Sequence, residues 1–103
     1  MRTFPKSLAK FREIVNERGK RLRTLPIEEL NRLAGSIEQL TVDSRPATIG
    51  VIVLPLSTGG IQVVVQGFMK TKLIGNNVAL DGFYKYADGS LATMAEDEFL
   101  QFD

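Results

Sequence analysis

Cysteine, histidine and tryptophan are all absent from this chain of 103 residues. The lack of cysteine and histidine excludes a disulfide, a thiolate zinc site, a cysteine nucleophile and an imidazole general base. Acid–base catalysis would have to use Asp, Glu, Lys85, Tyr84 or Tyr86, and no spacing of carboxylates indicates a pair suited to it. We therefore expect a protein that is not an enzyme and that uses neither a metal ion nor a cofactor.

Long apolar segments are also missing. The longest apolar run, residues 49–56, is interrupted by Gly50 and Pro55, whereas a membrane-spanning helix needs about 20 residues. Residues 1–4 lead into a charged segment rather than an apolar stretch, so no secretory signal is expected. We expect a cytoplasmic protein without membrane contact, and the lack of cysteine is compatible with that compartment.

Enough apolar residues are present for one core. Leu, Ile, Val and Phe together number 33, which is well above the level of disordered proteins. A chain of this length buries roughly 60–70% of its unfolded surface without metal or disulfide support. We therefore expect a single domain over residues 1–103, with a helical pair (1–35), an antiparallel sheet (36–94) and a C-terminal docking segment (95–103).

The first third of the chain carries the spacing of two amphipathic helices. Apolar residues recur at helical intervals from residue 8 to residue 15, and Pro5 suits a first helical turn because no N–H is needed there. Gly19 is typical of the position just after a helix, so the first helix is predicted over about 5–18. The second is predicted over 26–34, with Gly35 as its stop.

Alternating apolar and polar residues replace the helical spacing after residue 36. Residues 36–43 fit either a first strand or a continuation of the second helix. Two further alternating segments, 47–56 and 61–71, predict a hairpin because a glycine-containing turn separates them. A fourth strand is predicted over 78–87, with Gly82 as a bulge.

The remaining residues predict a short strand and a short helix. Asp88 and Gly89 form a strong turn signal before a fifth strand over 91–94. Acidic residues that favour a helix N-terminus precede three apolar anchors, Phe99, Leu100 and Phe102. The expected fold is therefore α+β: two N-terminal helices, a five-stranded antiparallel β-meander and a short C-terminal helix. The sheet is expected either to stay open or to curl into a small barrel.

The middle strands are apolar on both faces, which is the most informative feature of the sequence. An antiparallel sheet with helices on one face normally has a polar second face. Either the chain covers this face itself, by barrel closure, by its second helix or by its C-terminal segment, or a partner covers it. We favour a non-catalytic interaction or regulatory module that binds a protein partner, most simply a second copy in a homodimer. The residues expected at its interface are Ile52, Leu54, Val64, Phe68, Tyr84 and Tyr86.

Positive charge is concentrated near the N-terminus. Residues 1–35 have nine Lys or Arg and four Glu (+5), whereas residues 36–103 have four Lys or Arg and eight acids (−4). Nucleic-acid binding is therefore the alternative function, because Lys and Arg displace counterions from phosphates. No motif or pair of stacking aromatics accompanies these charges, so we favour a solvated helix surface as their explanation. The candidate contacts are Arg12, Arg18, Lys20, Arg21 and Arg23.

Overall fold

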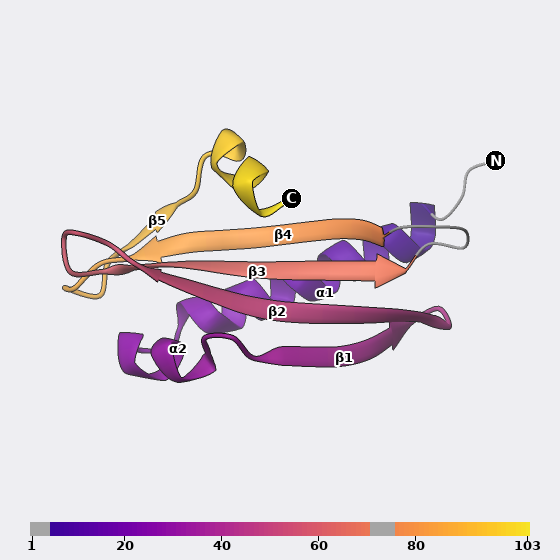
Figure 1. The fold of residues 1–103 in the computed structure, drawn as a ribbon, viewed down its shortest axis with the longest axis horizontal. Helices are drawn as coiled ribbons and strands as arrows, with labels where there is room; N and C mark the ends of the chain where they lie inside the picture. The colour runs from indigo at the N-terminus through magenta and orange to yellow at the C-terminus, as the bar shows by residue number, and fades with distance from the viewer. Residues whose placement is uncertain (1–4, 71–75) are drawn as a thin grey trace.

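Figure 1 shows the computed structural model, which describes residues 5–70 and 76–103. Two α-helices come first, α1 (Pro5–Arg23) and α2 (Ile27–Leu33). Five strands and a 3₁₀ helix follow: β1 (Ile37–Val42), β2 (Arg45–Pro55), β3 (Ile61–Lys70), β4 (Asn76–Lys85), β5 (Leu91–Thr93) and η1 (Glu96–Phe102). The predicted α+β class and the order of its elements are confirmed.

The strands form one antiparallel sheet in the order β1-β2-β3-β4-β5, so each strand pairs with its neighbour in the sequence. β1 and β5 are the two edges, and the sheet is open rather than closed into a barrel. The ladder between β3 and β4 is continuous, and Gly82 pairs directly with Val64. The predicted bulge at Gly82 is therefore wrong.

Helix α1 is longer than predicted: it ends at Arg23, and Gly19 lies inside it. A Cβ atom on Gly19 would collide with the carboxylate of Asp81 in β4. Gly19 therefore allows α1 to approach the sheet closely instead of ending the helix. The end of α1 is held by Lys85 of β4, whose Nζ donates to the carbonyl oxygens of Arg23 (3.2 Å) and Leu25 (2.7 Å).

The inner face of the sheet, which packs against α1, contains the core. A Cβ atom on Gly67 of β3 would lie 2.7 Å from Cζ of Phe11 and 2.8 Å from Cγ2 of Val15. Both of these α1 side chains are fully buried, and complete burial of an apolar side chain contributes about 1.5–3 kcal/mol. The same core includes Leu22, Leu30, Ile49, Val63, Val65, Met69, Ala79 and Phe83.

The chain passes from α2 into β1 at Gly35, whose φ of +81° is a conformation that glycine adopts without strain. The Gly35 N–H donates to the carbonyl oxygen of Val51 (2.8 Å), and the Val51 N–H donates to that of Ser36 (3.1 Å). Because the backbone already bonds to β2 at this point, the following residues form a strand rather than more of α2.

Strand β2 begins two residues before the predicted position, since the turn before it is confined to Asp43 and Ser44, both with positive φ. Asp43 also accepts hydrogen bonds from Lys10 Nζ (2.9 Å) and Ser7 Oγ (2.7 Å) of α1. These bonds, that of Lys10 above all, hold the pKa of the Asp43 carboxyl below its usual value. Strand β3 ends at Lys70, and the predicted residue 71 lies outside the described residues.

Strand β4 occupies residues 76–85 rather than 78–87, and β5 ends at residue 93 rather than 94. In Figure 1 the chain then crosses to the face of the sheet opposite α1, where η1 lies near β4. This helix is the predicted short C-terminal element. Among the described helices, none combines the length and apolar character needed to cross a bilayer.

Candidate interaction surface

The outer face of the sheet is the face turned away from α1, formed by the even-numbered residues of β2, β3 and β4. Residues directly paired in an antiparallel sheet point to the same face. The register therefore places Ile52, Val64 and Gly82 in one row across the three strands. The β3–β4 half and the β1–β2 half of this face differ in how the rest of the chain covers them.

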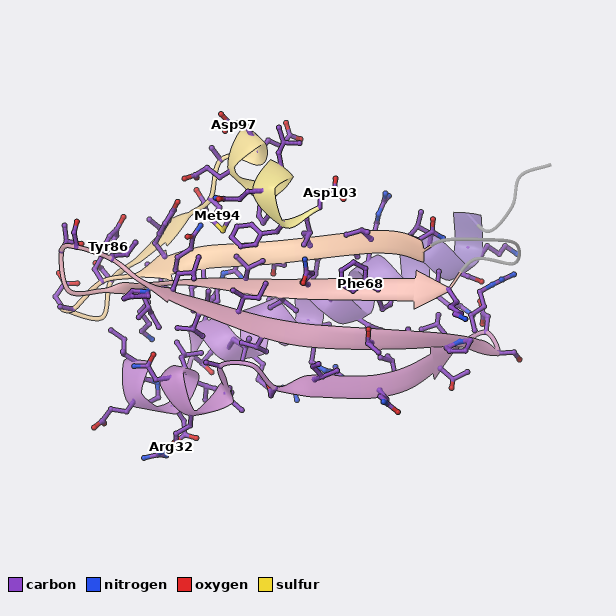
Figure 2. The ribbon with its side chains drawn as sticks, viewed as in Figure 1. Arg32, Phe68, Tyr86, Met94, Asp97 and Asp103 are labelled. Carbon is purple, nitrogen blue, oxygen red and sulfur yellow. The ribbon has the colours of Figure 1, made fainter. Side chains whose placement is uncertain are left out.

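Residues 94–103, which we call the C-terminal segment, cover the β3–β4 half. Gly82 forms the floor beneath them: a Cβ atom there would lie 2.5 Å from Sδ of Met94 and 3.3 Å from Cε1 of Phe99. Val64, the neighbour of Gly82 in β3, is 0% exposed. Figure 2 shows Met94 between η1 and β4, and Phe68 farther along β3. The chain thus covers part of its own outer face.

Hydrogen bonds fix the C-terminal segment on the sheet. The side-chain amide of Gln66 donates to the carbonyl oxygen of Phe102 at 2.5 Å, and the hydroxyl of Tyr84 donates to the carboxylate of Glu98. The second oxygen of Glu98 accepts from the backbone N–H of Ala95 at 2.6 Å. The carboxylate raises the pKa of Tyr84 to about 12, and the tyrosine hydroxyl lowers the pKa of Glu98.

The β1–β2 half of the outer face has no such cover among the described residues. Leu54 is 40% exposed, and Ile37, which pairs with Gly50, is 69% exposed. Gly50 forms the floor of a shallow hollow of about 210 Å³, lined by Ile37, Ile52 and Phe68 among others. An apolar hollow with an open mouth is a feature of docking surfaces.

The six residues predicted at a partner interface belong to this face but differ in exposure. Val64 is covered by the C-terminal segment, whereas Leu54 remains exposed. Tyr86 follows β4 and stacks on Tyr84, with ring centroids 6.4 Å apart. Four of the six are half-buried: Ile52, Phe68, Tyr84 and Tyr86.

Two apolar residues are more exposed than the sequence predicted. Ile37 lies in the segment whose strand or helix character the sequence left open. Leu100 was predicted as an apolar anchor of the C-terminal segment, and this prediction is wrong: its side chain is 70% exposed, whereas Phe99 and Phe102 are half-buried. No periodicity marks either residue as exposed, because their exposure depends on which face of the sheet each element covers.

Two of the five candidate nucleic-acid contacts are bound to carboxylates of the sheet. Arg18 donates two hydrogen bonds to Glu38 of β1, at 2.8 and 2.6 Å. Arg23 donates to Asp81 of β4 at 2.9 and 3.2 Å and to the carbonyl oxygen of Gly82 at 3.0 Å. The hydrogen bonds from Arg18 lower the pKa of Glu38. Both guanidinium groups therefore fasten α1 to the sheet.

The other three candidate contacts, Arg12, Lys20 and Arg21, are exposed on α1. Lys20 lies 3.8 Å from Glu17, a solvent-exposed ion pair of the kind that contributes little to stability. Acidic side chains are therefore interspersed among the basic ones on the helix surface. The aromatic ring close to the end of α1 is that of Phe83 in β4, and it packs under Arg23, with 4.8 Å between the guanidinium carbon and the ring centroid.

Within the described residues, no group of three or more acidic side chains gathers in the way a metal ion requires. Tyr84 and Lys85, named above as conceivable acid–base groups, are engaged by Glu98 and by the end of α1. Comparison of the chain with protein-family models, with curated proteins and with solved structures finds no match.

Proposed function

We propose that this protein is a small, non-catalytic interaction module that self-associates through the outer face of its sheet. The proposal is carried by one observation: the C-terminal segment covers only half of an apolar sheet face. Val64 on the covered half is fully buried, whereas Leu54 and Ile37 on the other half are not. Burial of apolar surface contributes about 25 cal/mol per Å², which favours association wherever such a face meets a complementary one.

The dimensions of the face support a stable contact. The molecule measures 47 Å by 25 Å across this face, about 1,200 Å² in outline, so a standard interface of roughly 800 Å² per partner requires the C-terminal segment as well as the uncovered half to take part. A second copy is the simplest occupant because it presents the same apolar half, as in the isologous interfaces of most homodimers. We propose the cytoplasm as the compartment, on the sequence alone.

The test is the solution mass at micromolar concentration, measured by sedimentation for the natural chain and two matched variants. Leu54→Asp places a charge on the outer face, whereas Leu91→Asp places one on the inner-face side of β5. The two positions are similarly exposed, Leu54 by 40% and Leu91 by 47%. We expect the natural chain and Leu91→Asp to form dimers. Leu54→Asp is expected to raise the dissociation constant by at least about tenfold, since an interface would then bury an unpaired carboxylate.

A chain that stays monomeric at every concentration contradicts self-association, as does a dimer that Leu91→Asp weakens as much as Leu54→Asp. The alternative function is tested on the same samples with duplex and single-stranded nucleic acid at low salt. Binding by a monomer that falls steeply with salt, and again on changing Lys20 and Arg21 to Ala, favours nucleic-acid recognition.

A further inference from the structure

The outer face has a ridge on one side and a trough on the other. The C-terminal segment forms the ridge above Gly82 of β4, and the hollow above Gly50 is lined by residues of β1, β2 and β3. In Figure 1 the ridge lies near β4, and no described element lies in front of β2. A stepped face of this kind is complementary to itself when a two-fold axis exchanges its two halves.

Ridge and hollow lie at the same level along the strands. Gln66 of β3 pairs directly with Gly50 of β2 on one side. The side chain of the same Gln66 donates to the carbonyl oxygen of Phe102 in the ridge. A two-fold axis parallel to the strands keeps this level and exchanges the edges of the sheet, so it places the ridge of one copy over the hollow of the other.

The side chain best placed to fill the hollow is Leu100. It lies two residues before Phe102 in the ridge, and its 70% exposure leaves most of its apolar surface in water. The C-terminal segment already fills the depression above Gly82 with Met94 and Phe99. The depression above Gly50 has an apolar lining, and the nearest atoms to a Cβ there lie 3.7 Å away or more.

We infer that two copies form a closed dimer in which Leu100 of each enters the Gly50 hollow of the other. This inference rests on the proposed function, which it extends by naming the contact. Because the exchange is reciprocal, it closes at two copies and does not lead to filaments. Residues 86–103 contain five acids and no Lys or Arg, and none of the residues that line the hollow carries a charge. Apolar contact rather than ion pairing therefore holds the dimer, and added salt does not weaken it.

The absence of cysteine from the chain makes disulfide crosslinking a clean test. Ile37→Cys chains, with a thiol at the hollow, are mixed with Leu100→Cys chains under oxidising conditions. The control mixture pairs Leu100→Cys with Leu91→Cys, whose thiol lies on the inner-face side. All three positions are exposed, so each variant is expected to fold, which circular dichroism verifies. We expect a covalent dimer of twice 11.4 kDa from the first mixture only.

Equilibrium measurements complete the test. Leu100→Ala removes the side chain that enters the hollow, and Gly50→Leu fills the hollow, so each is expected to raise the dimer dissociation constant by about tenfold or more. A dimer that forms without this crosslink and is insensitive to both variants overturns the reciprocal contact while leaving self-association in place. A monomeric natural chain overturns both, and dissociation on adding salt contradicts an apolar contact.

Discussion

Replacing Gly82 by alanine adds one methyl group at the point where the C-terminal segment contacts the sheet. The new Cβ would lie 2.5 Å from Met94 Sδ and 2.9 Å from the carbonyl oxygen of Val63. The sulfur belongs to a flexible side chain, but the carbonyl oxygen is part of the β3 ladder and cannot withdraw without breaking strand pairing. Crowding of this kind in a packed region costs about 1–3 kcal/mol of unfolding free energy.

Gly50→Ala is the matched control for this change. Gly50 lies on the same face, in the next row of the ladder, and the nearest atoms to its added Cβ are 3.7 Å away or farther. Neither glycine has positive φ, so both substitutions restrict the unfolded chain equally. We expect Gly50→Ala to be neutral or to stabilise the protein by about 0.4–1 kcal/mol. The difference between the variants therefore measures the crowding at Gly82, to which the Val63 carbonyl oxygen and the C-terminal segment both contribute, and the rate of proteolytic cleavage within the segment reports on the segment alone.

The assay is urea unfolding at a protein concentration low enough to keep the chain monomeric. With a slope of about 1–3 kcal/mol per M, the Gly82→Ala midpoint is expected roughly 1 M below that of Gly50→Ala. Chymotrypsin cleavage after Phe99 should also accelerate in Gly82→Ala alone, because a crowded segment leaves the sheet more often. Equal midpoints and equal cleavage rates would refute the claim that Gly82 seats the C-terminal segment.

Two other predictions concern charged groups. Arg23→Ala is expected to lower the unfolding free energy by about 2–4 kcal/mol because it leaves the half-buried Asp81 without its ion-pair partner. Arg18→Ala should lower it by under about 1 kcal/mol because the Arg18–Glu38 pair is more exposed. Equal losses in urea unfolding would contradict this ranking. Ultraviolet titration in a Tyr86→Phe background should place the pKa of Tyr84 near 12, and Glu98→Gln should return it toward about 10. Since folding raises that pKa, the contribution of Tyr84 to stability is complete below pH about 10 and is lost as pH rises through the folded value. Since folding lowers the pKa of Glu98, its contribution is present above pH about 4.3 and is lost on acidification.

The parts of the fold that depend on local spacing could be predicted from the sequence. Alternation identified the strands, and Gly35 and Asp88-Gly89 marked turns because their backbone requirements are local. Gly19 shows where local reasoning fails. A glycine after a helical pattern indicates a stop, but this one faces Asp81 of β4, and only the folded sheet brings that carboxylate near.

The candidate surface was predictable only in part for the same reason. The sequence indicated a sheet that is apolar on both faces, and it left open whether the chain covered the second face itself. The coverage depends on Gly82, which looked like a bulge and instead makes room for Met94. The basic run likewise gave no sign that Arg18 and Arg23 bind carboxylates, because Glu38 and Asp81 belong to strands β1 and β4, and only the folded sheet brings them beside α1.

The order of elements has a consequence for how the chain is made. Neighbouring strands are consecutive in sequence, so each hairpin can close as soon as its second strand leaves the ribosome. Helix α1 packs instead on β3 and β4, which are synthesised long after it. Its apolar stripe, including Phe11 and Val15, therefore stays in water until Gly67 has been translated. Helix α1 therefore emerges before the strands on which it packs, and its apolar face is available for aggregation until they have been synthesised.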